Sequence, residues 1–535
     1  MEWTPSSVIR GLFDSRNGPT DRFLSRWIFL RALGAIYFSA FFSLVFQIRG
    51  LIGPQGILPA GEYLQSLAEQ VGRARYWYVP SLLWFSSGSH TLTALCWVGM
   101  FAAILLVLNF WPRGMLVVCF VCFLSFVSAA EDFSGYQSDG MLLEAGFLAL
   151  FVAPAGFRPG FGKSRPPVRA ALYLLLWEWF RIYFESGVAK IAGGDLEWRN
   201  FTAMDDYYQN GPLPTWIGWY VQHLPHWFHA AATGLTLALE LVLIFAAFLP
   251  RPFRIALFFV VTPWQIVIIL TANYTFLNYL VLLLGFLLLD DRFLARFFPN
   301  SWKPQLPPPF TQEALSANSA PRDLRQNIQL WLAPLRVSIT AVLLVWIFYA
   351  TTVQMVWMIT PAPLPTSPVA LLEPFRIANR YGLFAVMTRG RYEIEFQGSN
   401  DGRIWAAYSF RYKPQALDKP PRIYAPHQPR LDWNLWFASL GEWHGNPMVL
   451  RVERSLLSND PDVLALFAAN PFPQGPPRQV RAVLWQYWFT SMAEKRETGL
   501  WWRRESLGLY APAIQLAPEG RIVVTQWPGP LPPHE

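Results

Sequence analysis

Several ionisable residues lie inside long apolar runs of the sequence, where a charged group costs at least about 2.5 kcal/mol and needs a reason. Glu178, Arg181 and Glu185 share one run, and offsets of three and seven residues place them on one narrow helical face. An arginine between two glutamates is self-neutralising. The triad therefore either packs the inside of a helix bundle or forms the polar wall of a cavity.

Lys190 ends the same run. Because an α-helix turns by about 100° per residue, Lys190 lies on a different side of the helix from Glu185. A lysine near a membrane interface can extend its ammonium to water, whereas a partly buried one can act as a base. Glu144 and Glu240 lie in two other runs and could face the triad or a substrate. Asp139 opens the run of Glu144, where a carboxylate suits the positive end of a helix dipole. The candidate catalytic residues are thus Lys190, Glu144 and Asp139. Glu240 and the triad together form a second candidate set, a polar cluster within the membrane.

Two other patterns are weaker signals of chemistry. Cys119 and Cys122 have CxxC spacing, but they lie in an apolar helix with no strand before them, which favours two small buried residues over a redox pair. His223, His226 and His229 recur every third residue, yet a proline interrupts the helix between them, so we predict no metal site. The sequence contains no Walker A, GxSxG or HExxH motif.

The composition places these residues in a membrane protein. Of 535 residues, 53% are hydrophobic and 15% are charged, against about 25% charged in soluble domains. This composition excludes an ordinary soluble enzyme and a disordered chain. The net charge of +8 is spread between the apolar runs, which indicates membrane topology and not nucleic-acid binding. All three cysteines lie in apolar runs, so no disulfide framework is expected in an exported domain.

Nine runs approach the roughly 20 apolar residues that a membrane-spanning helix needs. The first has no small-residue cleavage site behind it, so we interpret it as a retained helix and not as a signal peptide. The predicted spans are 23–48, 91–110, 114–130, 140–157, 170–190, 230–249, 255–272, 275–289 and 337–359.

Lysine and arginine in the short loops predict the orientation. If the N-terminus is cytoplasmic, the basic connections all fall on the cytoplasmic side: 158–169, 250–254, 290–326 and the turn at Arg113. The opposite side receives the acidic connections 131–139 and 195–206. Nine spans then place the C-terminal region outside the cytoplasm.

We therefore predict a polytopic α-helical membrane domain of about nine spans, followed by an extracytoplasmic β-rich α+β domain. An amphipathic helix over 60–72 is expected to lie on the outer surface. The predicted parts are a membrane bundle (1–299, spans one to eight with outer loops 49–90 and 191–229), a proline-rich cytoplasmic linker (300–326), the ninth span (327–360) and the extracytoplasmic domain (361–535).

In the last part of the chain, charges return and apolar runs shorten. Residues 391–412 predict a hairpin, because apolar residues alternate with polar ones and Asn-Asp-Gly at 400–402 tolerates positive φ. Residues 480–490 and 501–510 predict further strands, and 431–440 and 460–469 predict helices.

Ordered motifs over most of the chain resemble the lipase maturation factor family of polytopic membrane proteins. They include YQSDGMLLEAGFLAL (136–150), RIYFESGVAKIAGGDLEWRNFTAMDDYYQNGPLP (181–214), RYGLFAVMTRGRYEIEFQGS, PHQPRLDWNLWFA and GLWWRRESLGLYAPA. By this resemblance, Trp198, Arg199, Asp205 and Tyr208 stand where the pattern of an outer loop has them.

The resemblance implies a factor that assists the maturation of exported proteins such as secreted lipases. Known eukaryotic members reside in the endoplasmic reticulum membrane; here, abundant Trp, Arg and Pro with few lysines suggest a bacterial member in the inner membrane. The expected partners are membrane lipids and lipase-like clients contacted through Trp433 and Trp436, without nucleic acid. No cofactor is predicted, although a lipid or quinone fits the alternative hypothesis. The chain has no cysteine after Cys122, so disulfide handling by the exported domain is not expected.

That alternative hypothesis comes from a remoter resemblance. SGVAKIAGGDLEW (186–198) is similar to the glycine-lysine segment of vitamin K-dependent γ-carboxylase-type (HTTM) membrane domains, in which a lysine is the proposed base that deprotonates a quinol. It implies a membrane-embedded enzyme acting on a lipid or quinone-like substrate, with Lys190 as the base. Asp139 stands where that pattern has a histidine. A scaffold would tolerate Lys190→Ala, and an enzyme would not.

Overall fold

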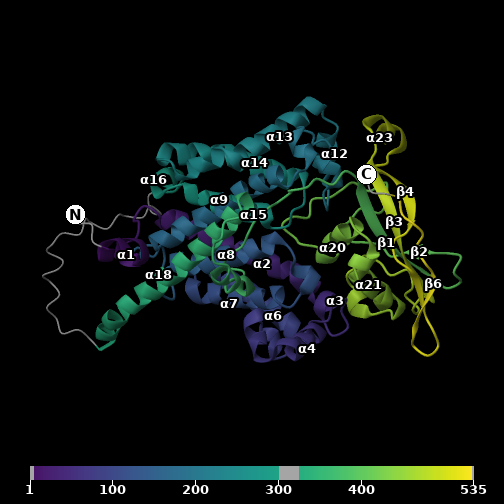
Figure 1. Cartoon of the computed structure of the whole chain (residues 1–535), viewed down its shortest axis with the longest axis horizontal. Helices are drawn as coiled ribbons and strands as arrows, with labels where there is room; N and C mark the ends of the chain where they lie inside the picture. Colours follow the sequence, from purple (N-terminus) through teal and green to yellow (C-terminus); the bar gives the residue numbers. More distant parts are fainter. Residues whose placement is uncertain (1–4, 300–323, 533–535) are drawn as a thin grey trace.

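The computed structural model describes residues 5–299 and 324–532. Figure 1 shows a bundle of long helices with an α+β domain at one end of it. The predicted linker 300–326 lies outside the described residues except for its last three, which begin helix α18 (Leu324–Ile359). A membrane domain followed by a C-terminal domain that contains a β-sheet is therefore confirmed.

Each of the nine predicted spans coincides with a helix of the described residues. Five helical segments are apolar and long enough to cross a membrane, by length and composition: Phe23–Val45, Ser89–Val107, His226–Phe248, Arg251–Thr271 and Ala333–Ile359. Helix α9 (Arg169–Ala192) is also long enough to cross a membrane, but it is less apolar because it carries the charged triad. The helices are α2 (Phe23–Val45), α6 (Ser89–Val107), α7 (Pro112–Val127), α8 (Gln137–Val152), α9 (Arg169–Ala192), α13 (His226–Leu241) with η5 (Leu243–Phe248), α14 (Arg251–Thr271), α15 (Leu277–Gly285) with η6 (Phe286–Leu288), and α18.

Different segments cover the two ends of the bundle. At one end, Arg26 donates to the backbone oxygens of Gly162 (3.0 Å) and Arg165 (2.8 Å), and Arg113 donates to that of Ala153 (2.8 Å). At the other end, Asn273 donates to the Arg422 carbonyl at 2.8 Å. The basic loops and the C-terminal domain thus lie at opposite ends (Figure 1).

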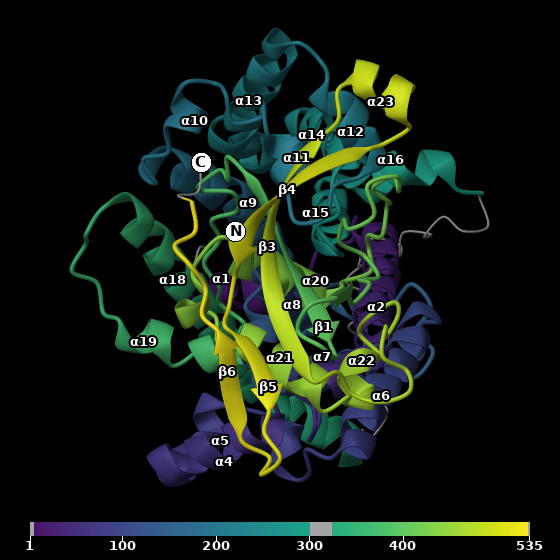
Figure 2. The same cartoon turned by 90° about the vertical axis from the view of Figure 1, so that its right-hand side faces the viewer.

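The C-terminal domain is built on a six-stranded antiparallel sheet of order β2-β1-β3-β5-β6, in which β4 also pairs with β3 (Figure 2). Helices α20 (Arg430–Ser439) and α21 (Met448–Leu457) contact β1 and β3. The strands are β1 (Arg391–Ser399), β2 (Ala406–Ala407), β3 (Gln479–Phe489), β4 (Trp502–Leu509), β5 (Ala513–Leu516) and β6 (Ile522–Gln526). Every residue of β1 is buried, so both faces of this strand are covered.

Most local predictions for this half are confirmed. Strands β1 and β2 form the predicted hairpin, with Gly398 opposite Ala406 and Gly402 at φ +70°. The predicted helix at 460–469 is shorter, α22 (Pro461–Leu464), because the chain turns away and Ala468 donates to the Ser409 carbonyl at 2.7 Å. The amphipathic segment is helix α4 (Ala60–Val71). The sequence interpretation missed α21, β5 and β6.

Glu453 on α21 is a buried acid in the core of this domain. Neither of its carboxylate oxygens has a hydrogen-bond partner among the described residues. Burial raises the pKa of Glu453 well above its ordinary value of 4.5. The folded state therefore favours the neutral acid.

We expect Glu453→Gln to remove a pH dependence of stability. Above pH 4.5 the unfolded chain releases this proton while the folded chain keeps it, so the free energy of unfolding of the wild type falls as pH rises. The variant should match the wild type at pH 4 and unfold a few degrees higher at pH 8. Thermal unfolding of the full chain in detergent across this range checks it. Parallel profiles would contradict the assignment.

Candidate functional site

Residues 376–384, which we call the strap, connect the C-terminal domain to the bundle without helix or strand structure. Irregular backbone within a membrane domain is tolerated only where protein groups satisfy its polar atoms. In the strap these groups are side chains of α8, α9 and the outer loop. The buried charges predicted from the sequence are among them.

The first contact joins Glu144 of α8 and Arg181 of α9 to the strap. The two side chains form a fully buried ion pair, and Arg181 donates to the Asn379 carbonyl at 2.6 Å. Glu144 accepts from the backbone N–H of Asn379 at 3.0 Å and from the Tyr381 hydroxyl at 2.9 Å. Glu185, 3.9 Å from Arg181, accepts from the Tyr381 backbone N–H at 2.7 Å. Two acids and one arginine thus hold the middle of the strap.

The second contact lies near the end of α9. The Lys190 ammonium is 2.9 Å from the carboxylate of Glu240 on α13, and it donates to the Leu383 carbonyl at 2.9 Å. It also lies 4.9 Å from the centre of the Trp198 ring. The Trp198 indole donates to the Phe384 carbonyl at 3.0 Å. The end of the strap is therefore bound by Lys190 and Trp198 together.

The third contact attaches α20 directly to α8. Arg430 donates to both carboxylate oxygens of Asp139, at 2.7 and 2.9 Å, and both side chains are buried. Its guanidinium also lies 4.7 Å from the ring centre of Phe126 on α7. A bidentate arginine–carboxylate pair fixes the orientation of the two side chains as well as their distance. We call the three contacts together the interdomain clamp.

Arg391 at the start of β1 adds a contact with the outer loop. It donates to the backbone oxygens of Gln209 and Pro212, at 3.0 and 3.1 Å, and pairs with Glu393. Burial lowers the pKa of Arg391, and the neighbouring Glu393 partly offsets this effect. The predicted outer loop thus packs against the sheet at this point.

The structure does not bring the three candidate catalytic residues together. Lys190 pairs with Glu240, Glu144 with Arg181, and Asp139 with Arg430. Lys190 and Glu240 border a cavity of about 110 Å³ together with Trp198 and Tyr208, and neither Glu144 nor Asp139 lines it. The membrane polar cluster is divided in the same way, because Glu240 faces Lys190. The carboxylate oxygens of Glu178 have no hydrogen-bond partner among the described residues.

The remaining loop residues have local partners. Arg199 donates to the Ile191 carbonyl at 3.1 Å, and Asp205 contacts the His226 ring at 3.0 Å. His223 contacts the backbone oxygens of Trp219 and Thr490, and His229 contacts that of Leu224. The three histidines therefore do not converge. Within residues 5–299 and 324–532, no group of three or more His, Cys, Asp or Glu residues is placed to hold a metal ion.

Trp433 and Trp436 are buried, which does not fit their predicted contact with clients. Each is 8% exposed. The Trp436 indole donates to the Asn210 carbonyl of the outer loop at 3.1 Å, and the Trp433 ring packs against Tyr136 and Tyr274. Because α20 docks onto the bundle, its aromatic side chains fill the interface between the domains. Cys119 and Cys122 are both buried free cysteines.

Sequence reasoning missed the residues of the C-terminal half that complete the clamp. These are Asn379, Tyr381, Leu383 and Arg430. The signal that could have pointed to these residues is the segment RYGLF (380–384), which is part of a motif of the family resemblance. Pairing it with α8 and α9 requires contacts about 200 residues apart in the chain, between Tyr381 and Glu185 for example.

The fold and the clamp define a polytopic membrane protein whose C-terminal domain is fixed to the helix bundle by the buried ion pair Asp139–Arg430 and by hydrogen bonds between the strap and buried charged side chains of the bundle. Residues 24–296 match the family model described as lipase maturation factor transmembrane domain, and residues 377–512 match lipase maturation factor C-terminal domain. The chain belongs to the lipase maturation factor family. The second match begins within the strap.

Two curated relatives show the extent of the similarity. Lipase maturation factor 1 of Bos taurus is 31% identical over 529 residues, which cover 95% of this chain and 92% of the relative. Lipase maturation factor 2 of Homo sapiens is 30% identical, with 92% and 83% covered. No solved structure matches the chain. These matches give no support to the carboxylase-type hypothesis.

Proposed function

We propose that this membrane protein assists the folding and maturation of exported proteins such as secreted lipases. Relatives that align along most of the chain are named lipase maturation factors. The observation that carries the proposal within this chain is the interdomain clamp. It fixes a β-sheet domain at one end of the bundle, so that the domain presents a constant surface to clients at the membrane.

The proposed topology has nine spans, with the N-terminus and the basic loops in the cytoplasm and the C-terminal domain outside it. The separation of the arginine-rich end from the end that carries this domain supports this orientation through the positive-inside rule. The residue composition favours a bacterial inner membrane. A reporter enzyme fused after Glu535 should be active if it is of a type that functions only outside the cytoplasm. Activity only of a reporter that functions in the cytoplasm would contradict the topology.

The client surface that we propose is the free edge of strand β6. β6 is the last strand of the sheet, and its residues Ile522 and Val523 are exposed. Trp527, directly beyond the strand, is 65% exposed. Natural edge strands are usually protected by charge, proline or a covering element, because free backbone groups pair with other extended chains. An apolar, extended segment of an incompletely folded client can add to this edge as a further strand.

Val523→Lys should reduce client maturation, because a charged side chain on an edge strand opposes pairing with an apolar segment. We expect the specific activity of secreted lipases and esterases to fall toward that of cells lacking the gene, with the membrane protein present at its normal level. Thr498→Lys, on the exposed helix α23 (Met492–Thr498), is the matched control and should keep full activity. Equal activity of both variants would exclude the β6 edge as the client surface.

A further inference from the structure

A second cavity lies beside the strap, where α8 begins and α18 ends. Its volume is about 470 Å³, within the range of about 300–1,000 Å³ typical of ligand sites. Its walls include Gln137 of α8, Gln354 and Trp357 of α18, and the segment 366–381. It shares no lining residue with the smaller cavity at Lys190, although Asn379 and Tyr381 of the clamp form part of its wall.

The charged residues that line this cavity are Arg376, Arg380 and Glu373, so its lining carries a net charge of +1. Neither arginine has an ion-pair partner in the described part of the chain. Arg376 has left-handed backbone geometry, with φ 54° and ψ 33°, which is uncommon for a residue with a side chain. Two exposed guanidiniums that line one cavity and form no ion pair among the described residues match an anion with several oxygens, above all a phosphate.

The surroundings of the cavity indicate a membrane interface. On α18, Val342 and Val345 are exposed, as expected of side chains that face lipid. The cavity itself has apolar wall residues, Val127 and Val369. Tryptophan and tyrosine side chains concentrate at the level of lipid headgroups, and Trp357 lies at that end of α18.

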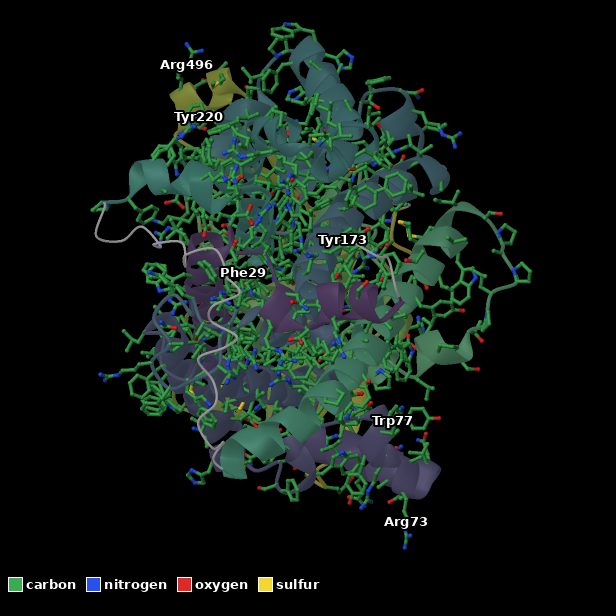
Figure 3. All side chains as sticks on the ribbon, turned by 90° about the vertical axis from the view of Figure 1, so that its left-hand side faces the viewer. Phe29, Arg73, Trp77, Tyr173, Tyr220 and Arg496 are labelled. Carbon is green, nitrogen blue, oxygen red and sulfur yellow. The ribbon has the colours of Figure 1, made fainter. Side chains whose placement is uncertain are left out.

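Further exposed aromatic side chains lie next to the cavity. Tyr76, Trp77 and Tyr78 of α5 (Arg75–Tyr78) are all exposed, and Trp77 packs against Phe375, the neighbour of Arg376, at 5.0 Å between ring centres. Figure 3 shows Trp77 at the rim of the molecule. The cavity therefore lies at headgroup depth, and a phosphate there would have acyl chains attached.

We propose that this cavity binds the phosphate of a phospholipid from the leaflet on the side of the C-terminal domain. Arg376 and Arg380 bind the phosphate oxygens, and the acyl chains follow the apolar surface of α18. Because both arginines belong to the strap, a bound lipid adds a contact that exists only when the strap is docked. The lipid therefore stabilises the docked state of the C-terminal domain by mass action.

The test is thermal unfolding of the full-length protein in mild detergent, with short-chain phosphatidylglycerol or the same concentration of inorganic phosphate added. We expect the lipid to raise the unfolding temperature by a few degrees and inorganic phosphate to leave it unchanged. Arg376→Gln/Arg380→Gln should lose the response to lipid. Arg403→Gln/Arg454→Gln removes two exposed arginines of the C-terminal domain that do not line the cavity and should keep it. Arg380→Gln alone changes only an exposed side chain, so it reports a reduced response even if the double variant folds poorly.

Three results would overturn the proposal. An equal response to lipid in all variants would mean that the lipid acts on the protein as a whole. A response to inorganic phosphate as large as that to the lipid would mean a site for a free anion. No response of the wild type to the lipid would mean that the cavity does not bind this headgroup.

Discussion

Arg181→Ala is expected to destabilise the folded protein by about 3–5 kcal/mol, the usual effect of removing one partner of a buried ion pair. The change leaves the carboxylates of Glu144 and Glu185 buried without their cation, and it removes the hydrogen bond to the Asn379 carbonyl. Because these groups join α8, α9 and the strap, the C-terminal domain should loosen from the bundle. Chemical denaturation of the purified protein in detergent measures the loss.

Arg199→Ala is the matched control for this variant. Arg199 is an exposed arginine of the outer loop 191–229 with one hydrogen bond to a backbone oxygen. We expect a change within about 0.5 kcal/mol, as is usual for surface substitutions. If Arg181→Ala were as stable as this control, the buried ion pair would not hold the strap.

The second large effect concerns Lys190 and separates a structural role from catalysis. Lys190→Met leaves Glu240, whose side chain is only 13% exposed, without its partner and removes the bond to the Leu383 carbonyl, so we expect a loss of about 3–5 kcal/mol. Because Lys190 holds both Glu240 and the strap, a scaffold is also expected to lose stability on Lys190→Ala, contrary to the prediction from the sequence. Lys190→Met/Glu240→Leu removes both charges together, and replacing a buried pair with apolar side chains is often neutral or stabilising.

We expect the double variant to recover most of the stability and most of the client maturation that the single variant loses. The measurement is the specific activity of secreted lipases and esterases, compared with cells lacking the gene. If Lys190 acted as a base, the double variant could not restore activity, because methionine cannot accept the proton. A double variant that is stable and normally inserted but inactive would favour chemistry at Lys190 over the clamp.

The helix positions could be predicted from the sequence because apolar runs of membrane length are local signals. The hairpin of β1 and β2 was also predictable, since alternation and the turn at 400–402 lie within one short segment. Helix α21 and the short strands β5 and β6 carry weaker local patterns and were missed. Helix α22 ended early because of a pairing with Ser409, which no local pattern reveals.

The candidate site was predictable in its residues but not in its pairings. Helical spacing placed Glu178, Arg181 and Glu185 on one face, yet it could not show that Arg181 pairs with Glu144. The partners on the strap are uncharged backbone groups and polar side chains, which composition does not distinguish. Trp433 was predicted to contact clients, and the docking of α20 onto the bundle buries it instead.

Buried side chains of the bundle hold the strap in place. Hydrogen exchange of the strap in the full-length protein tests this most directly, because the backbone N–H groups of Asn379, Tyr381 and Leu383 donate to Glu144, Glu185 and Ser186. We predict that these amide hydrogens exchange as slowly as those of β1, although the strap has no regular secondary structure. Exchange as fast as in the exposed turn at 401–404 would contradict the account.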